Sequence, residues 1–152
     1  MKKEPKINKI IALRRPKIIA QVGGPIDESG ATLAIYGKSL DPVKITRVLG
    51  MPPTRSFKRG HRHGLKSPPT GHGAWFLEIR GEAPDGPDIQ LRKLLKKLPD
   101  SAKVWKELNR KYTVQIRFGL HMTGWNKGFG FTPDLVHRIA KMRVEVQFDI
   151  YA

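Results

Sequence analysis

The sequence predicts an α+β fold, in which a small antiparallel or mixed sheet of four to five strands is covered by helices packed mainly on one face. Four segments alternate apolar and polar residues, as strands with one buried face do. Between them lie segments whose apolar residues recur every three or four positions, as in amphipathic helices. A doubly wound parallel sheet, whose strands are buried on both faces, is therefore disfavoured.

Residues 1–24 are expected to form a basic arm in front of a single α+β domain at 25–152. The arm holds seven Lys or Arg and one acid and ends in a glycine pair, a composition typical of a linker. Residues 17–22 are apolar enough to add an edge strand. Charges and a proline interrupt the short apolar runs of the arm, so we expect neither a signal peptide nor a transmembrane association.

The first strand is predicted at 32–36 and the first helix at 42–49. Asp41 suits the N-cap, Pro42 the first helical position, and Gly50 the left-handed position after the last turn. The apolar face of this helix is expected to hold Ile45, Val48 and Leu49.

The later elements follow from the same periodicities. They are a strand at 75–80, a helix at 91–98 that ends at Pro99, a short helix at 104–108, a strand at 112–118, a helix from 132 to 142 and a closing strand at 144–150. The last helix is expected to bury Leu135, Val136, Ile139 and Met142.

The charge of the chain favours an anionic partner. It has 29 Lys and Arg against 13 Asp and Glu, a formal net charge of +16, which attracts nucleic acid or an acidic protein through a long-ranged field. The chain has no cysteine, which excludes disulfides and thiolate metal sites and is compatible with the cytoplasm, where we expect the protein to reside.

The segment MPPTRSFKRGHRHG, residues 51–64, is the main candidate for contacts with phosphate groups, against the alternative of a solvated loop. Five cations lie within twelve residues, and Phe57 is available to stack on a base. These cations are Arg55, Lys58, Arg59, Arg62 and Lys66. Lys44 and Arg47, three apart on the first predicted helix, point outward together and join the candidate set.

A second motif, WNKGFGF at 125–131, reproduces the first five positions of the RNA-recognition-motif signature. Trp125 and Lys127 are therefore candidate nucleic-acid contacts. The signature ends at Thr132 and Pro133, where a helix is predicted instead of a continuing strand. For this reason we favour Phe129, Phe131 and Trp125 as residues that pack or line a pocket.

Metal and catalytic sites find little support in the sequence. His61, His63 and His72 are the best ligand set, but residues 42–77 contain no acid and several cations, so no metal and no cofactor are expected. No nucleophile elbow, zinc-protease or P-loop motif is present. We therefore expect no catalytic residue; a dispersed site built from His61, His72, His121 and Glu78 is the weaker alternative.

Several short stretches together resemble a bacterial family, the domain of unknown function 4279. They are Leu33-Ala-Ile-Tyr-Gly37, the Leu40-Asp-Pro run through Leu49-Gly50, Pro53-Thr54 before Gly60, Trp75, and Asp149-Ile-Tyr151. The resemblance covers residues 30–151 and implies a small α+β domain without established chemistry. It also implies that the turn from Pro53 to Gly60 is first of all structural, and it leaves the basic arm and His61-Arg-His-Gly64 outside the shared pattern.

Two functional hypotheses follow. The first is a non-catalytic protein that binds an anionic macromolecule, nucleic acid (RNA or DNA) before others, through the basic arm and the loop. The alternative is a protein-interaction domain of the immunity or regulator type that neutralises an acidic toxin or enzyme.

Overall fold

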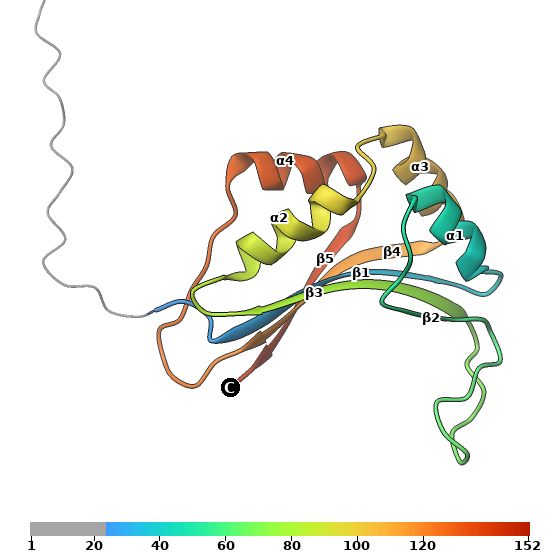
Figure 1. Ribbon diagram of the computed structural model, residues 1–152, viewed down its shortest axis with the longest axis horizontal. Helices are drawn as coiled ribbons and strands as arrows, with labels where there is room; N and C mark the ends of the chain where they lie inside the picture. The colour runs from blue at the N-terminus through green and yellow to red at the C-terminus, as the bar shows by residue number, and fades with distance from the viewer. Residues whose placement is uncertain (1–23) are drawn as a thin grey trace, which may run out of the picture.

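A computed structural model describes residues 24–152 as one five-stranded sheet with four helices on one face (Figure 1). The α+β class is confirmed, and so is the placement of the helices on one face. In chain order the elements are β1 (Glu28–Gly37), α1 (Pro42–Leu49), β2 (Arg55–Phe57), β3 (Gly73–Glu82), α2 (Pro87–Lys97), α3 (Ala102–Lys111), β4 (Thr113–His121), α4 (Pro133–Met142) and β5 (Glu145–Tyr151). The predicted strand at 17–22 and nearly all of the basic arm lie outside the described residues.

The sheet is mixed, with the order β2-β3-β1-β4-β5. The central strand β1 pairs antiparallel with β3 and with β4, whereas β5 runs parallel to β4. The parallel pair is joined by α4, because a parallel connection must cross back over the sheet.

The edge strand β2 corrects the sequence-based expectation of a loop at this point. Arg55 pairs with Phe76, Ser56 with Trp75 and Phe57 with Ala74. A strand of three residues is too short for an apolar-polar alternation to identify it.

The core lies between the sheet and the helices. Alternate residues of the strands, among them Leu33, Trp75 and Phe118, point toward the helices and are buried there. The predicted caps of α1 are present, since the Asp41 side chain accepts a hydrogen bond from the Val43 amide and Gly50 has a φ of 76°.

Two of the predicted core residues, Val48 and Val136, are exposed. Helix α1 buries Ile45 and Leu49, and helix α4 buries Leu135 and Met142. The apolar stripe of each helix is thus wider than the strip that contacts the sheet, so its outer residue remains in solvent.

Candidate functional site

The face of the sheet opposite the helices is open, and it carries two adjoining hollows with mainly polar linings. A hollow of about 420 Å³ adjoins a second of about 240 Å³, and the two share Thr32, Glu78, Arg80 and Gly119. The larger one is also lined by Thr54, Arg55, Phe76, Arg117 and Asp149. We call these two hollows together the open-face groove.

Two glycines keep the floor of the open-face groove low. Gly30 of β1 lies directly opposite Gly119 of β4. A Cβ atom added at Gly119 would meet no atom within 4 Å, so a side chain at this position would have room above the sheet. Glycine weakens a strand interior, and it is often found there where a ligand or another backbone approaches closely.

Three arginines from three different strands line the groove: Arg55, Arg80 and Arg117. Arg80 pairs with Glu78 at 2.9 Å, and Arg117 donates to the Tyr36 hydroxyl at 3.2 Å and to Asp149 at 3.0 Å.

These hydrogen bonds raise the pKa of both guanidinium groups above the ordinary value, for Arg117 through Tyr36 first and Asp149 next, and for Arg80 through Glu78. Arg55 lies over the ring of Phe76, 4.5 Å from its centroid, and forms no ion pair within residues 24–152. Of the three arginines in the groove, Arg55 is therefore the one that no carboxylate among residues 24–152 neutralises.

Aromatic rings gather at the β2 end of the open face. Phe57 contacts Phe76 and is stacked on His61, with ring centroids 6.2 and 5.3 Å apart respectively. Tyr36 meets Phe76 and His72 edge-on, at 5.5 and 5.6 Å. Together with His63, whose ring lies 4.9 Å from that of Phe57, these residues form what we call the aromatic cluster.

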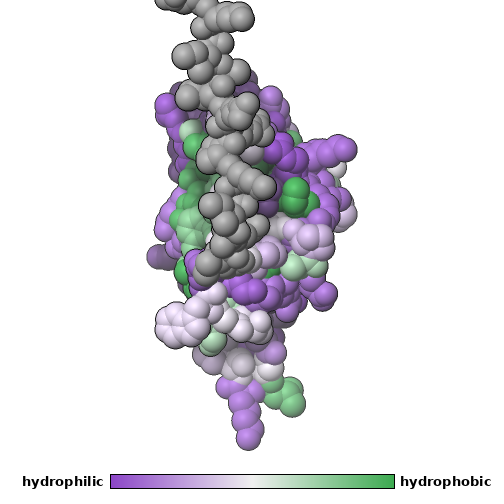
Figure 2. Space-filling view, turned by 90° about the vertical axis from the view of Figure 1, so that its left-hand side faces the viewer, coloured by the Kyte–Doolittle hydropathy of each residue, from purple (hydrophilic) through white to green (hydrophobic). Residues whose placement is uncertain are grey.

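The loop between β2 and β3, residues 58–72, projects to the side of the sheet away from the helices (Figure 1). Its base is held by two backbone hydrogen bonds, from Gly60 to Thr70 and from Thr70 to His61, both 2.8 Å long. Gly60 has a φ of 87°, a conformation that favours glycine. Seen from the N-terminal end, this lowest projection of the molecule is mainly hydrophilic (Figure 2).

The cations of the loop are exposed, and the loop contains no acid. Lys58 lies 3.7 Å from Asp41, and Arg62 donates to the Ser67 carbonyl at 2.8 Å. Arg59 and Lys66 form no ion pair within the described part of the chain. The predicted set Arg55, Phe57, Lys58, Arg59, Arg62 and Lys66 thus comes from one contiguous segment on one side of the sheet.

The three histidines considered as a metal-ligand set, from which no metal site was expected, belong to the aromatic cluster. The rings of His61 and His63 lie 5.1 Å apart, and His72 is near Phe57 at 6.4 Å. Among residues 24–152 no group of three His, Cys, Asp or Glu side chains is arranged to hold a metal ion.

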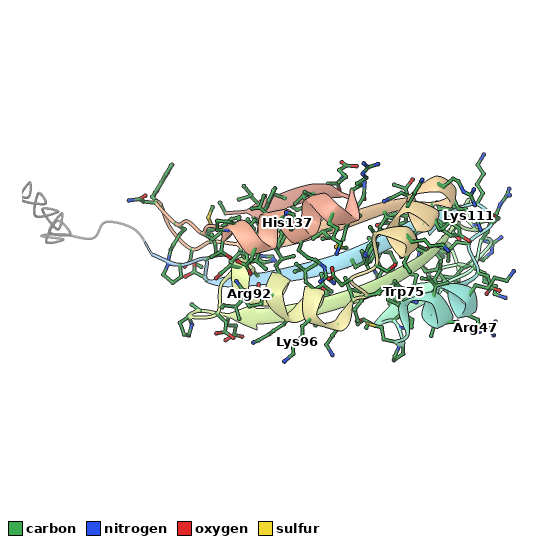
Figure 3. All side chains as sticks on the ribbon, turned by 90° about the horizontal axis from the view of Figure 1, so that it is seen from above. Arg47, Trp75, Arg92, Lys96, Lys111 and His137 are labelled. Atoms are coloured by element: carbon green, nitrogen blue, oxygen red, sulfur yellow. The ribbon has the colours of Figure 1, made fainter. Side chains whose placement is uncertain are left out.

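The other predicted residues lie elsewhere. Lys44 and Arg47 belong to α1 in the helix layer, where Figure 3 places Arg47 at one end of the molecule. Trp125 and Lys127 lie on the segment between β4 and α4, at the opposite end of the strands from loop 58–72 (Figure 1). Because β1 spans ten residues, the two ends are about 30 Å apart.

The WNKGFGF segment corrects one further expectation. Trp125 is 97% exposed, so its side chain does not pack against the described part of the chain, and it lines none of the four hollows described in this section or beside α1 and α3. Phe129 and Phe131 do pack, since Phe131 lies 5.3 Å from Phe118 and 5.4 Å from Phe129. Lys127 pairs with Asp27 at 3.0 Å and is largely covered, so an anion must compete with that carboxylate.

Sequence reasoning missed Thr32, Tyr36, Arg80, Arg117 and Gly119 as site residues. Thr32, Tyr36, Arg80 and Arg117 stand on the polar side of a predicted strand, where a solvated side chain is the ordinary expectation. Gly119 follows the end of the strand predicted at 112–118, and only the observed length of β4, Thr113–His121, places it in a strand interior.

A separate hollow of about 500 Å³ lies between α2 and α4, where Figure 3 marks Arg92, Lys96 and His137. The carboxylates that line this hollow form ion pairs with cations that also line it. Asp134 pairs with Arg92 at 2.7 Å, and Asp100 pairs with Arg138 at 2.9 Å and with Lys141 at 3.0 Å. This network joins α4 to α2 and to the turn after it, and we assign it a structural role.

Comparison with known families matches residues 27–152 to a family described as a domain of unknown function, DUF4279. The chain belongs to the DUF4279 family. The DUF4279 match contains every strand and helix described above, and it leaves residues 1–26 outside. Neither the curated proteins nor the solved structures contain a match to the chain. Within residues 24–152, no helix is long and apolar enough to cross a membrane.

Proposed function

We propose that this protein binds nucleic acid without catalysing a reaction, and that the nucleic acid lies along the open face of the sheet beside loop 58–72. A single strand of RNA or DNA fits this surface best, because its bases are free to stack on side chains while its phosphates meet cations.

The observation that carries the proposal is the convergence of cations and rings on one side of the sheet. Arg55 and Phe57 belong to the edge strand β2, and loop 58–72 continues from them on the side away from the helices (Figure 1). Charge spread evenly for solubility alone would give no reason for aromatic rings to lie among these cations.

Electrostatics supports the same surface. Residues 1–23 contain seven cations and one acid of the chain's 29 and 13, so the described part retains a net charge of +10. The groove arginines Arg80 and Arg117 are paired with carboxylates that orient them, whereas Arg55, Arg59 and Lys66 form no ion pair within residues 24–152. In this arrangement the cations of the loop provide affinity for the phosphates, and the oriented arginines Arg80 and Arg117 fix the position of the nucleic-acid strand on the sheet.

The test is titration of labelled oligonucleotides of about 20 residues, single-stranded RNA, single-stranded DNA and duplex DNA, at about 50 and about 200 mM salt. Contacts with about five phosphates predict a slope of log affinity against log salt near −3.5 for single strands. Replacing Arg55, Lys58, Arg59 and Arg62 together by alanine should weaken binding strongly and reduce this slope.

A matched control removes four charges from the helix layer. Lys96, Lys97, Lys103 and Lys106 are exposed and form no ion pair within the residues that the structure describes. If their replacement by alanine weakens binding as much as the first variant does, only total charge matters and the proposed surface is wrong. Binding that does not depend on salt would contradict the phosphate contacts themselves.

A further inference from the structure

The strand β5 is an edge of the sheet with little protection against pairing. It has seven residues and, among residues 24–152, pairs only with β4, whereas the other edge, β2, has three residues. It contains no lysine, arginine or proline, the residues that commonly block such edges. Phe148 is 45% exposed and Ile150 is 61% exposed. The edge therefore presents apolar side chains beside its unpaired backbone.

The backbone groups that face outward can be assigned from one hydrogen bond. The carbonyl of Tyr151 accepts from the amide of Met122 at 2.9 Å, so Tyr151 directs its backbone groups toward β4. Successive residues of a strand direct these groups to opposite sides. Val146, Phe148 and Ile150 consequently present their N–H and C=O groups at the outer edge, and no backbone partner for them occurs on that side within residues 24–152.

We propose that β5 pairs antiparallel with β5 of a second copy of this chain, about a two-fold axis at Phe148. In this register Phe148 faces Phe148 of the second copy, and Val146 faces its Ile150. All three outward residues then exchange backbone hydrogen bonds with the residue opposite. Phe148 is the middle residue of the three whose backbone groups face outward. With the axis at any other residue of β5, at least one of Val146, Phe148 and Ile150 would lie opposite no other member of these three.

The side chains in this register are complementary to themselves. On the helix side, valine, phenylalanine and isoleucine meet across the axis and bury their exposed apolar surface. On the open side, Asp149 faces Gln147 and Glu145 faces Tyr151, so no two like charges lie directly opposite each other. A two-fold axis also makes the interface identical on both copies, the commonest arrangement for a homodimer.

An existing row of rings leads to the axis. Phe148 is stacked on Phe118 at 5.2 Å and lies 5.9 Å from Phe129. Pairing would continue this row into the second copy and join the two open faces into one sheet. Because β2 forms the opposite edge, each loop 58–72 would lie at an outer end of the joined sheet. The pairing itself does not depend on the proposed function.

Single cysteines test the register, since the natural chain has none. Residues opposite each other in a hydrogen-bonded antiparallel pair have Cα atoms about 5.5 Å apart, a distance that a disulfide spans. Phe148→Cys should form a disulfide-linked dimer under mild oxidation. Ile150→Cys alone should crosslink much more slowly, and mixing it with Val146→Cys should give the crosslinked heterodimer. Equal crosslinking of Phe148→Cys and Ile150→Cys would overturn the register.

Sedimentation of the full-length chain tests the association without cysteines. An interface built from one seven-residue strand of each copy is small, and small interfaces are commonly transient, so protein at about 0.1 mM is appropriate. Ile150→Lys should abolish the dimer, whereas Val43→Lys, at an α1 residue that is 60% exposed, should leave it intact. A natural chain that sediments as a monomer overturns the proposal. Slow amide exchange at Phe148 in such a monomer would show that residues of the same chain cover the edge.

Discussion

Gly119→Val should stabilise the protein and weaken its binding of nucleic acid, two effects that seldom occur together. Glycine costs about 0.5 to 1 kcal/mol relative to alanine in a strand interior, and a β-branched residue favours a strand further. The structure places no atom within 4 Å of the added Cβ, and the backbone at Gly119 has no positive φ. We therefore expect a gain of about 1 kcal/mol in the free energy of unfolding, with no strain to offset it.

The same methyl groups would fill the floor of the open-face groove, where Thr32, Arg80 and Arg117 converge. We expect the affinity for a single-stranded oligonucleotide to fall about tenfold, the loss that accompanies one stacked base. Urea denaturation gives the first quantity and fluorescence anisotropy the second. Gly119→Ala serves as an intermediate, with most of the gain in stability and a smaller loss of affinity.

Two results would refute this reasoning. A destabilised Gly119→Val protein would mean that the backbone at this position requires glycine for a reason other than space. A stabilised protein with unchanged affinity would mean that the nucleic acid does not enter the groove, and binding would then be confined to loop 58–72.

Three further predictions concern stability. The Arg92 guanidinium, and after it the Thr132 hydroxyl, lower the pKa of Asp134 to about 2 from 3.8, so this carboxylate stabilises the fold above about pH 4 and loses that effect as the pH falls toward 2. Asp134→Asn should lower the melting temperature at pH 6, and the difference from the natural protein should vanish near pH 2; a difference that persists there would contradict the assignment. Ser29→Ala should lower the free energy of unfolding, measured by urea denaturation, by about 1 to 3 kcal/mol, because the buried side-chain carbonyl of Gln90 loses the hydroxyl that donates to it. An unchanged midpoint would mean that water replaces the hydroxyl. Trp125→Ala should change the free energy of unfolding by less than about 0.5 kcal/mol, since the side chain is exposed, and a loss above 2 kcal/mol would show that it packs after all.

Local patterns in the sequence were sufficient for most of the fold. Alternation identified β1, β3, β4 and β5, because each of these strands buries one face and exposes the other. The ends of α1 followed from Asp41, Pro42 and Gly50, whose effects act within a few residues. The sequence also indicated the family of the chain, which the DUF4279 match confirms.

The arrangement of the candidate site depended on the tertiary structure. Alternation shows that a residue such as Arg117 faces away from the core, but not which residues of other strands lie beside it. Strand order and register decide that, and they place Arg117 beside Tyr36 and Asp149, residues 81 and 32 positions away. The same long-range pairing separated Trp125 from the basic loop by the length of a strand, although both were candidate nucleic-acid contacts.

By itself, then, the sequence determined the class of the fold, its caps, its charge and its family, because these depend on composition and on spacings of a few residues. Only the tertiary structure decided which polar residues form one groove, that Arg55–Phe57 is an edge strand, and that the outer edge of β5 has no backbone partner within residues 24–152. These properties arise from hydrogen bonds between residues distant in the chain, and no local pattern specifies the partner of such a bond.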